Sequence, residues 1–459
     1  MRFFQHTILA PLLALASFEA VGFAISPILA DAVLPSSFNS AIDAAISVAV
    51  FGATVCLGFT AMGLYSRRQR SRLLGIMLRA GAALSGGVVA IGLVSYFFPP
   101  LAMPRQVLAL AVFIAFVLTA IARATFDRIA DEDIFKRRVL VYGAGRRAVS
   151  VSSLRRRSDQ RGFLIVAFAR LDDERVAVPP DRTTSLSGDL IDFCRQNEVD
   201  EIVVAMDDRR RAFPVHDLLD CRLNGIEVID IVDFLERETG KVRLDVLNPS
   251  WIIFAPGFDR SRFRESSKRA LDVVASLILL VIAFPFGVLA ALAIKLEDGI
   301  RAPVLYGQLR VGLDRQEFRI LKFRSMRVDA ETPGRAVWAS KGDARVTRVG
   351  AFIRKVRIDE LPQILNVLRG QMSFVGPRPE RPEFVSGLEN RIPYYRERHC
   401  VKPGITGWAQ LCYPYGSSEH DTVEKLQYDL YYVKNHSLIF DIAILLQTAE
   451  VVLWGQGAR

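Results

Sequence analysis

The sequence predicts a three-part membrane protein: a bundle of four membrane-spanning helices, a Rossmann-like α/β domain, and a mixed, mainly α monotopic domain with a re-entrant membrane helix. Three observations support this fold class. The 459-residue chain is 51% hydrophobic with a mean hydropathy of +0.24, which is too apolar for an ordinary soluble protein. Its first quarter contains four long apolar runs, and its middle alternates short apolar strands with helical stretches. The expected domains cover residues 1–130, 136–250 and 266–459, and the re-entrant helix covers 268–295.

The N-terminal domain is expected to cross the membrane four times. Each apolar run approaches the roughly 20 residues that a helix needs to span hydrocarbon. Residues 1–20 resemble a secretory signal peptide, but the apolar run continues past Ala20 and is interpreted as an uncleaved first span. Glu19 and Arg79 fall inside spans, where they are expected to form a functional or a structural pair. The runs are Thr7–Ala30, Ala41–Tyr65, Leu73–Phe98 and Val107–Ala122.

Positive charge predicts that both ends of this bundle lie in the cytoplasm. Arginines lie between the second and third runs and after the fourth, whereas the first loop, residues 31–40, has no Lys or Arg. The chain carries a net charge of +10, which suits anionic lipid and nucleotides, and no nucleic-acid partner is expected. Its five cysteines have no CxxC spacing, which argues against a zinc site or a disulfide framework and fits a reducing compartment.

The middle domain begins with an apolar strand, Arg138–Tyr142, followed by a GxGxxA sequence at Gly143–Ala148. Glycines at this spacing let a dinucleotide pyrophosphate approach the backbone, with a helix that starts near Arg146. No acidic residue closes a second strand about 20 residues later. A folded spacer or an oligomerisation module, which would build a homo-oligomer, is therefore favoured over NAD binding. Further strands are expected at Phe163–Phe168, Glu201–Ala205 and Glu227–Ile231.

The apolar run Ala270–Ile294 is long enough to span a membrane but contains Pro285 near its middle. Lys268 and Arg269 flank one end and Lys295 flanks the other, so the charges give no bias toward crossing. A proline inside a helix removes a backbone hydrogen bond and kinks the helix. A helix that enters from the cytoplasm, breaks at Pro285 and returns is therefore favoured over a kinked fifth span.

The stretch RKVRIDELPQ, residues 354–363, places two carboxylates directly after three cations. Pro362 suits a first helical turn, so Asp359 and Glu360 are expected to open a helix that runs from Glu360 to about Leu368. A carboxylate can be a covalent nucleophile toward phosphorus, and its neighbour can hold Mg²⁺. The alternative is a solvated charge run that caps a surface helix.

Five motifs in the last part of the chain carry a resemblance to a known family. They are Lys268-Arg269, KFRSM at 322–326, RIDELPQ at 357–363, SFVGPRPE at 373–380 and KPGITGWAQ at 402–410. In this order they resemble the bacterial sugar transferases, which are polyprenyl-phosphate phosphoglycosyl transferases with a monotopic catalytic domain. The first two domains resemble the larger members, and Glu236–Phe258 resembles members linked to exosortase-associated exopolysaccharide systems. Where the family often has serine before the helix-breaking proline, this chain has Phe284.

The resemblance implies an enzyme that uses a UDP-sugar and undecaprenyl phosphate at the lipid bilayer. Asp359 would attack the β-phosphate, expel UMP and hold the phosphosugar until the lipid phosphate displaces it. Glu360, together with Asp359, would hold Mg²⁺, and basic side chains would bind phosphate oxygens. The residues implied to bind phosphate or nucleotide are Lys322, Arg324, Arg354, Arg378, Gly404, Thr406, Trp408 and Gln410.

Several alternatives accompany this interpretation. The KPGITGWAQ residues would either shape a uridine site or form a packed turn. The chain could instead be a non-catalytic scaffold of a polysaccharide assembly complex, although the intact acidic pair and basic residues argue against this. A membrane-anchored Rossmann-type oxidoreductase is disfavoured, because a YxxxK pair is missing near the middle domain. The expected location is the bacterial inner membrane, with a multi-pass anchor and a cytoplasmic catalytic domain.

The C-terminal region carries further, weaker signals. Ser437–Trp454 predicts an apolar helix that lies on the membrane surface or packs on the domain. His399 and His420 are expected to be structural rather than metal ligands. The charged residues of Arg391–Lys402 predict a solvated face.

Overall fold

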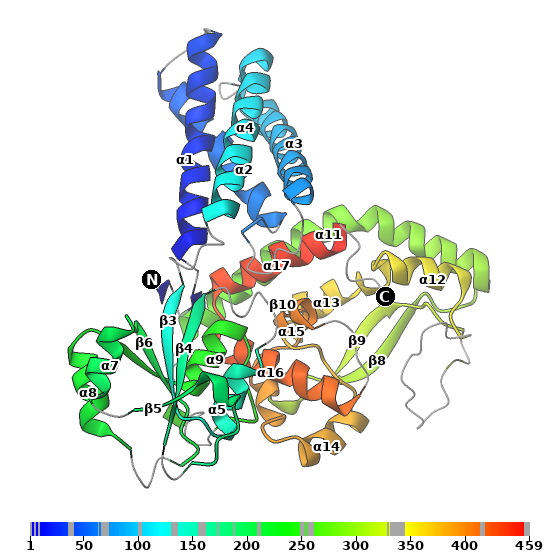
Figure 1. The fold of residues 1–459 in the computed structure, drawn as a ribbon. Helices are drawn as coiled ribbons and strands as arrows, with labels where there is room; N and C mark the ends of the chain where they lie inside the picture. The colour runs from blue at the N-terminus through cyan, green and yellow to red at the C-terminus, as the bar shows by residue number, and fades with distance from the viewer. Residues whose placement is uncertain are drawn as a thin grey trace. The chain divides into compact units, whose positions relative to one another are not determined.

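In the computed structural model the chain forms two compact units, residues 1–248 and 249–459 (Figure 1). The N-terminal unit contains the four helices formed by the apolar runs of the first quarter and the α/β domain, and the C-terminal unit contains all five motifs. The structure describes residues 2–3, 6–7, 10–34, 41–62, 64–65, 73–99, 103–129, 136–154, 162–171, 174–186, 189–208, 213–247, 253–254, 261–327, 330, 345–413 and 418–453.

Four long apolar helices coincide with the four predicted runs. Helix α1 packs against α2 and α4, α2 packs against α3, and α3 packs against α4. By length and composition α1, α3 and α4 are able to cross a membrane, while the apolar part of α2, Ala44–Thr60, is shorter. The helices are α1 (Ala10–Val33), α2 (Ala41–Ala61), α3 (Leu73–Phe97) and α4 (Arg105–Ile129), preceded by β1 (Arg2–Phe3) and β2 (His6–Thr7).

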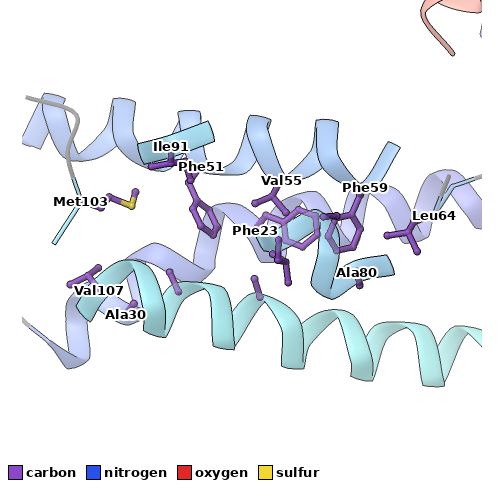
Figure 2. Packing of buried hydrophobic residues seen from close by; sticks show 14 residues of the cluster. Phe23, Ala30, Phe51, Val55, Phe59, Leu64, Ala80, Ile91, Met103 and Val107 are labelled. Carbon is purple, nitrogen blue, oxygen red and sulfur yellow. The ribbon is translucent and has the colours of Figure 1, made fainter. Parts of the chain in front are cut away.

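Aromatic and small side chains fill the interior of this bundle (Figure 2). The rings of Phe23 and Phe59 lie 4.7 Å apart between centroids, and both residues are buried. A Cβ on Gly58 would lie 3.1 Å from the backbone oxygen of Ala83. Small residues allow this close approach of two helices, which drives helix association where no hydrophobic effect is available.

Glu19 pairs with Arg123, so the predicted pairing of Glu19 with Arg79 is wrong. Arg123 donates from Nε and Nη2 to the two carboxylate oxygens of Glu19 at 2.7 and 2.9 Å, and from Nη1 to the carbonyl of Leu64. Helix α4 continues past the predicted end of its apolar run, so Arg123 lies within the helix and is buried. Bidentate pairing satisfies two buried charges that would be costly alone.

Five parallel strands form the sheet of the middle domain in the order β5-β4-β3-β6-β7. The four strands expected from the sequence are confirmed, and so is the helix expected near Arg146. Asp189 and Asp230 cap the helices that follow them, each accepting a hydrogen bond from the amide two residues on. The elements are β3 (Arg137–Tyr142), α5 (Arg146–Ser152), β4 (Phe163–Arg170), η3 (Pro180–Arg182), β5 (Thr183–Ser185), α7 (Leu190–Gln196), β6 (Glu201–Val204), α8 (Val215–Leu223), β7 (Glu227–Asp230) and α9 (Ile231–Thr239).

The C-terminal unit begins with α11 (Arg262–Asp298), a helix of 37 residues. The sequence predicted a break at Pro285, but the helix continues through this residue and bends along its length (Figure 1). A proline removes one helical hydrogen bond, while the turns on either side remain paired. By length and composition alone α11 could cross a membrane.

The rest of this unit is a compact assembly of short elements along α11. Strands β8 and β9 pair as an antiparallel hairpin, and β10 pairs with β11 in parallel. The elements are β8 (Leu305–Val311), η4 (Leu313–Arg315), β9 (Glu317–Phe323), α12 (Arg348–Lys355), η5 (Ile358–Glu360), α13 (Gln363–Leu368), β10 (Ser373–Val375), α14 (Pro382–Arg391), η6 (Arg396–Cys400), β11 (Gly404–Thr406), α15 (Trp408–Cys412), α16 (Glu419–Asn435) and α17 (Leu438–Leu453).

Candidate active site

The acidic pair lies in the 3-10 turn η5, between α12 and α13. The sequence predicted that the pair opens the next helix, but α13 begins at Gln363, with Pro362 as its N-cap. Leu361 and Pro362 separate the pair from α13. Arg357, whose φ of 63° lies in the left-handed region, turns the chain between α12 and the pair. This conformation costs a non-glycine residue of order 1–3 kcal/mol and is found at functional sites. Surrounding contacts must therefore hold the turn that presents the carboxylates.

Three cationic side chains surround the carboxylate of Glu360. Lys322 Nζ and Arg378 Nη2 donate to its Oε1 at 3.1 and 3.0 Å, and Arg357 Nη1 lies 3.8 Å from Oε2. Burial by itself would raise the pKa of Glu360, but Arg378, Lys322 and Arg357 outweigh it and hold the pKa well below its usual range. Glu360 is therefore ionised at neutral pH and gathers positive charge beside Asp359.

The carboxylate of Asp359 is in a different state. The residue is only 7% exposed, and within the described residues no hydrogen bond to its carboxylate is found. Burial raises the pKa of Asp359 and the charge of Glu360 raises it further, while Lys322, Arg354 and Arg357 lower it. A desolvated carboxylate beside fixed cations has lost the hydration shell that would hinder its attack on an electrophile.

Arg378 belongs to the SFVGPRPE segment, residues 373–380, whose backbone is held along its length. Its first three residues form β10, which pairs with β11. At its other end, the amide of Val311 donates to the carbonyl of Glu380 at 2.9 Å. The side chain of Arg378 is 37% exposed although its guanidinium contacts Glu360. It can therefore meet a second anion that approaches from solvent.

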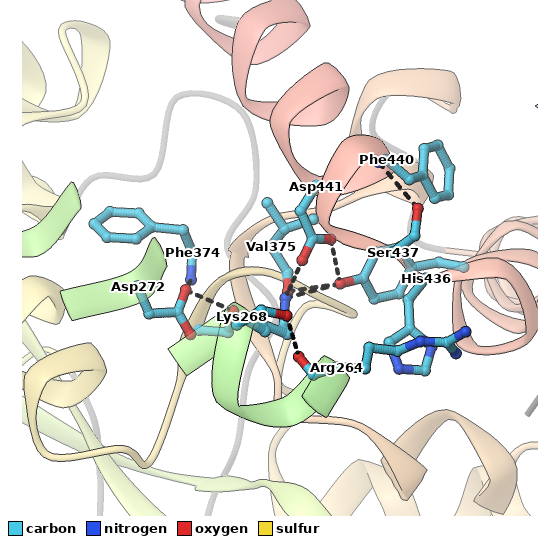
Figure 3. A network of polar contacts seen from close by, with 12 residues as sticks. Arg264, Lys268, Asp272, Phe374, Val375, His436, Ser437, Phe440 and Asp441 are labelled. Carbon is cyan, nitrogen blue, oxygen red and sulfur yellow. Dashed lines mark hydrogen bonds and ion pairs between the residues drawn. The ribbon is translucent and has the colours of Figure 1, made fainter. Parts of the chain in front are cut away.

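The start of α11 is bound to the same segment (Figure 3). Lys268 Nζ donates to Asp441 Oδ2 at 2.6 Å and to the carbonyl of Val375 at 3.0 Å. Asp272 Oδ1 accepts a hydrogen bond from the amide of Phe374 at 3.0 Å. The predicted membrane-helix residue Lys268 thus joins α11, α17 and the SFVGPRPE segment.

Two more of the predicted basic residues fasten α11 to this domain. Arg269 donates at 2.6 Å to the carbonyls of Val367 and Leu368 at the end of α13. Arg324, predicted to bind phosphate, is buried and pairs with Asp298 at the end of α11 at 2.6 Å. Arg269 thus joins α11 to α13 and Arg324 joins the end of α11 to the chain directly after β9, whereas Lys322, Arg354 and Arg378 act on the acidic pair.

The KPGITGWAQ residues contribute the strand β11 and pack closely against the SFVGPRPE segment. A Cβ on Gly404 would lie 2.1 Å from the backbone nitrogen of Gly376, so the two backbones pack directly against each other. The hydroxyls of Thr406 and Thr448 lie 2.8 Å apart. Strand β11 and the residues next to it therefore support the segment that carries Arg378.

Trp408 and Gln410 lie in α15, the helix that follows β11. The ring of Trp408 packs edge-on against Phe440 of α17, with centroids 5.2 Å apart. A nucleotide-binding role for Trp408, Gln410, Gly404 and Thr406 stays a prediction.

Sequence reasoning missed two side chains that shape the site. Arg357 faces Glu360, and its place in the RIDELPQ motif could have suggested this. Asp441 is buried and pairs with Lys268. A carboxylate in an apolar helix is a signal for such a buried partner.

The predicted solvated face at Arg391–Lys402 is wrong for Arg398 and His399, which are both buried. Burial and the charge of Arg398 lower the pKa of His399 to about 3, so the imidazole is neutral. Its ring lies edge-on to Tyr395, with centroids 6.1 Å apart. The high charge content of this stretch concealed a short 3-10 helix that faces the interior.

The GxGxxA loop of the middle domain is occupied by carboxylates of the same domain. Asp207 accepts hydrogen bonds from the first two amides of α5, both at 2.9 Å. Glu174 accepts one from the amide of Ala144 at 2.9 Å. A Cβ on Gly145 would lie 2.4 Å from Asp207. The amides that a pyrophosphate would use already have anionic partners, which favours the folded-module interpretation.

The acidic pair can supply ligands to the Mg²⁺ ion that the resemblance implies. In the part of the chain that the structure describes, Oε2 of Glu360 has only the long contact to Arg357, so it retains acceptor capacity. Asp359 accepts no hydrogen bond from any residue of that part. Within the described residues no cluster of three or more His, Cys, Asp or Glu side chains could hold a metal. Mg²⁺ is commonly bound by one or two carboxylates together with water and substrate phosphates, and this site fits that pattern.

Comparison with known proteins places this chain among related bacterial proteins. A family model described as bacterial sugar transferase matches residues 263–455. The chain is 44% identical over 239 residues to a UDP-N-acetylgalactosamine-undecaprenyl-phosphate N-acetylgalactosaminephosphotransferase of Aeromonas hydrophila, covering 52% of this chain and 55% of that protein. It is 33% identical to an undecaprenyl-phosphate glucose phosphotransferase of Komagataeibacter xylinus, covering 70% of this chain and 60% of that protein.

A third relative is matched over more of its length. The chain is 32% identical to a UDP-glucose:undecaprenyl-phosphate glucose-1-phosphate transferase of Xanthomonas campestris pv. campestris, over 72% of this chain and 69% of that protein. The match thus spans more than half, but less than two thirds, of the Aeromonas and Komagataeibacter proteins. The family model covers the acidic pair, its cations and all five motifs, and we conclude that this chain belongs to the bacterial sugar transferase family.

Proposed function

We propose that the chain transfers a sugar-1-phosphate from a UDP-sugar to undecaprenyl phosphate, releasing UMP and starting exopolysaccharide or other glycan assembly. The observation that carries this proposal is the buried carboxylate of Asp359 beside Glu360, with four cationic side chains around the pair. The names of the relatives join undecaprenyl phosphate to N-acetylgalactosamine or glucose donors. UDP-N-acetylgalactosamine and UDP-glucose are therefore the first donors to test.

The proposed reaction consists of two displacements at one phosphorus atom. First, a carboxylate oxygen of Asp359 bonds to the β-phosphorus, the bond from this phosphorus to the bridging oxygen breaks, and UMP leaves with the electron pair. Second, an oxygen of undecaprenyl phosphate bonds to the same phosphorus, and the bond to Asp359 breaks. The carboxylate is regenerated, and the product is an undecaprenyl-diphosphate sugar. A covalent intermediate divides one difficult transfer into two easier ones.

Fixed positive charge makes this reaction feasible, because the nucleophile and both substrates are anionic. The half-exposed guanidinium of Arg378 would bind phosphate oxygens in a bidentate manner while Glu360 holds it in place. Lys322 and Arg357 would offset charge near the bridging oxygen as UMP departs. Mg²⁺ held by Glu360 and Asp359 would add further positive charge.

We infer that this domain is monotopic and lies on the cytoplasmic face of the bacterial inner membrane. The contacts of α11 support the monotopic placement, and the cations that flank its apolar part support the cytoplasmic side. One end of the helix is held by Lys268, and the other end by the pair of Asp298 with Arg324. Between them the helix exposes apolar side chains, with Val281 75% and Phe284 68% exposed. A straight crossing would draw parts of one folded polar domain to opposite sides of the bilayer. A helix that dips into the membrane and returns avoids this cost.

Release of UMP by the purified full-length protein in lipid nanodiscs tests the proposed activity. We expect UMP from UDP-N-acetylgalactosamine or UDP-glucose when undecaprenyl phosphate is present, with one lipid-linked product per UMP. Glu383→Gln, which changes an exposed carboxylate on α14, is the matched control. Absence of both products across a panel of UDP-sugars would contradict the proposal.

Cysteine labelling on intact cells tests the placement of α11. Single cysteines replace Arg262 and Arg301 in a background without the five native cysteines, and a membrane-impermeant reagent is added outside. We expect neither site to react, because both ends of α11 belong on the cytoplasmic side. Labelling of the Arg301 position alone would show a fifth span and contradict the monotopic placement.

A further inference from the structure

We propose that Arg398 is a positioning residue for this reaction, because it fixes the backbone from which Arg378 reaches the acidic pair. The proposal rests on the proposed function in one respect, namely that Arg378 binds substrate phosphate. Arg398 lies in η6, more than thirty residues from the acidic pair in sequence. Among the described residues it makes no hydrogen bond or ion pair with Asp359 or Glu360. The contact that links Arg398 to the acidic pair is its hydrogen bond to the backbone carbonyl of Arg378.

The guanidinium of Arg398 is held in one orientation. Nη2 donates to the backbone carbonyl of Arg378 at 2.9 Å, and Nη1 donates to the hydroxyl of Tyr395 at 2.7 Å. Asp429 of α16 lies 2.9 Å from Nη2, and both side chains of this ion pair are buried. The guanidinium also lies over the ring of Tyr395, 5.1 Å from its centroid. A planar fork with these partners has little freedom to move.

The contact has a direct consequence for the acidic pair. Arg398 holds the carbonyl of Arg378, while the guanidinium of Arg378 lies 3.0 Å from Glu360. The next carbonyl, that of Pro379, accepts a hydrogen bond from Arg310 at 3.1 Å. Displacement of a catalytic group by about 1 Å can cost a hundredfold in rate. A buried arginine that anchors this carbonyl therefore protects the geometry of the phosphate-binding side chain.

Two substitutions separate positioning from general stability. Arg398→Gln removes the charge and leaves Asp429 buried without its partner, so this variant also risks lower stability. Arg398→Lys keeps a charge for Asp429 but cannot also reach the Arg378 carbonyl and the Tyr395 hydroxyl as a fork. We expect Arg398→Lys to lower kcat/KM by about tenfold, as for the loss of one hydrogen bond to a charged group. Arg396→Lys, an exposed arginine of the same short helix, is the matched control.

A double-mutant cycle with Arg378→Ala measures whether the effect of Arg398→Lys depends on the Arg378 side chain. A purely structural role of Arg398 would not produce such a dependence. If Arg398 acts by positioning Arg378, replacing Arg398 should have no further effect on the rate in a protein that already lacks the Arg378 side chain. We expect Arg398→Lys to lower kcat/KM by less than about twofold in the Arg378→Ala background. An equal loss in both backgrounds, or no loss in either, would overturn the proposal. No UMP release by the parent protein would instead be a failure of the proposed function.

Hydrogen–deuterium exchange tests the same inference without reference to activity. Peptides that cover residues 373–380 are followed in the parent protein, Arg398→Lys and Arg396→Lys, all in nanodiscs without substrate. We expect faster exchange in this segment for Arg398→Lys alone, because the anchor of the Arg378 carbonyl is lost. Unchanged exchange in this segment would overturn the positioning role, whether or not the chain is an active transferase.

Discussion

The GxGxxA loop of the middle domain and the acidic pair of the C-terminal unit both bring carboxylates against groups of positive potential, with opposite results. In the loop, Asp207 and Glu174 accept the backbone hydrogen bonds that a pyrophosphate would need. At the pair, Glu360 gathers cations while Asp359 stays buried and accepts no described hydrogen bond. The comparison teaches that a binding motif is not expected to bind its usual ligand where the fold already satisfies its polar groups. Chemistry is expected where the fold leaves a buried charge incompletely satisfied.

The largest effect is expected at the acidic pair, where Asp359 is the proposed nucleophile. Asp359→Asn keeps the size of the side chain but removes the charge that attacks phosphorus. We expect loss of all measurable UMP release and lipid-linked product in nanodiscs, with an unchanged melting temperature. Transfer at a rate near that of the parent would remove Asp359 from the mechanism.

The second prediction concerns the cation that faces both Glu360 and solvent. Arg378→Ala should lower kcat/KM by roughly ten- to hundredfold, the range for losing a hydrogen bond to a charged group. Arg378→Lys should recover only part of this loss, because lysine keeps the positive charge but lacks the bidentate guanidinium. Arg391→Ala, which removes a mostly exposed guanidinium, serves as the control. Equal kcat/KM values for Arg378→Ala and Arg391→Ala would exclude phosphate binding by Arg378.

The third prediction uses the coupling between the two carboxylates. Asp359 must be ionised to attack the β-phosphorus. The rate of the first displacement, measured as a burst of UMP release, should therefore fall as pH drops through the raised pKa of Asp359. The charge of Glu360 is one cause of that raised pKa. Glu360→Gln removes it, and we expect the acidic limb of the burst rate to move to lower pH. An unmoved limb, or a limb shifted to higher pH, would show that a different group controls this step.

The smallest effect is expected in the middle domain, where the carboxylates are structural. Asp207→Ala removes the acceptor of two amides at the start of α5. We expect a loss of about 1 kcal/mol in the stability of this domain, as for other helix caps, with no change in UMP release. Asp220→Ala, an exposed residue of α8, should cost less. Calorimetric binding of NAD to the parent protein would contradict the view that the loop is closed.

The strands of the middle domain, the four apolar helices and the acidic pair could be predicted, because each depends on a local pattern of residues. Contacts between distant residues could not. Lys268 meets Asp441 across 173 positions, and Glu19 meets Arg123 across 104. The burial of Arg398 likewise depends on Asp429 of a later helix, so its local surroundings suggested a solvated face. The left-handed backbone of Arg357 is imposed by such contacts against its own preference.

Mass spectrometry of the trapped protein tests the central claim most directly. The purified chain in nanodiscs is mixed with UDP-N-acetylgalactosamine or UDP-glucose without undecaprenyl phosphate, quenched in acid and digested. We predict that the peptide containing Asp359 gains the mass of one phosphosugar, and that this mass disappears when undecaprenyl phosphate is added before the quench. Asp359→Asn should carry no adduct. UMP release in step with lipid product, but with no adduct on Asp359 at any time, would contradict the covalent mechanism.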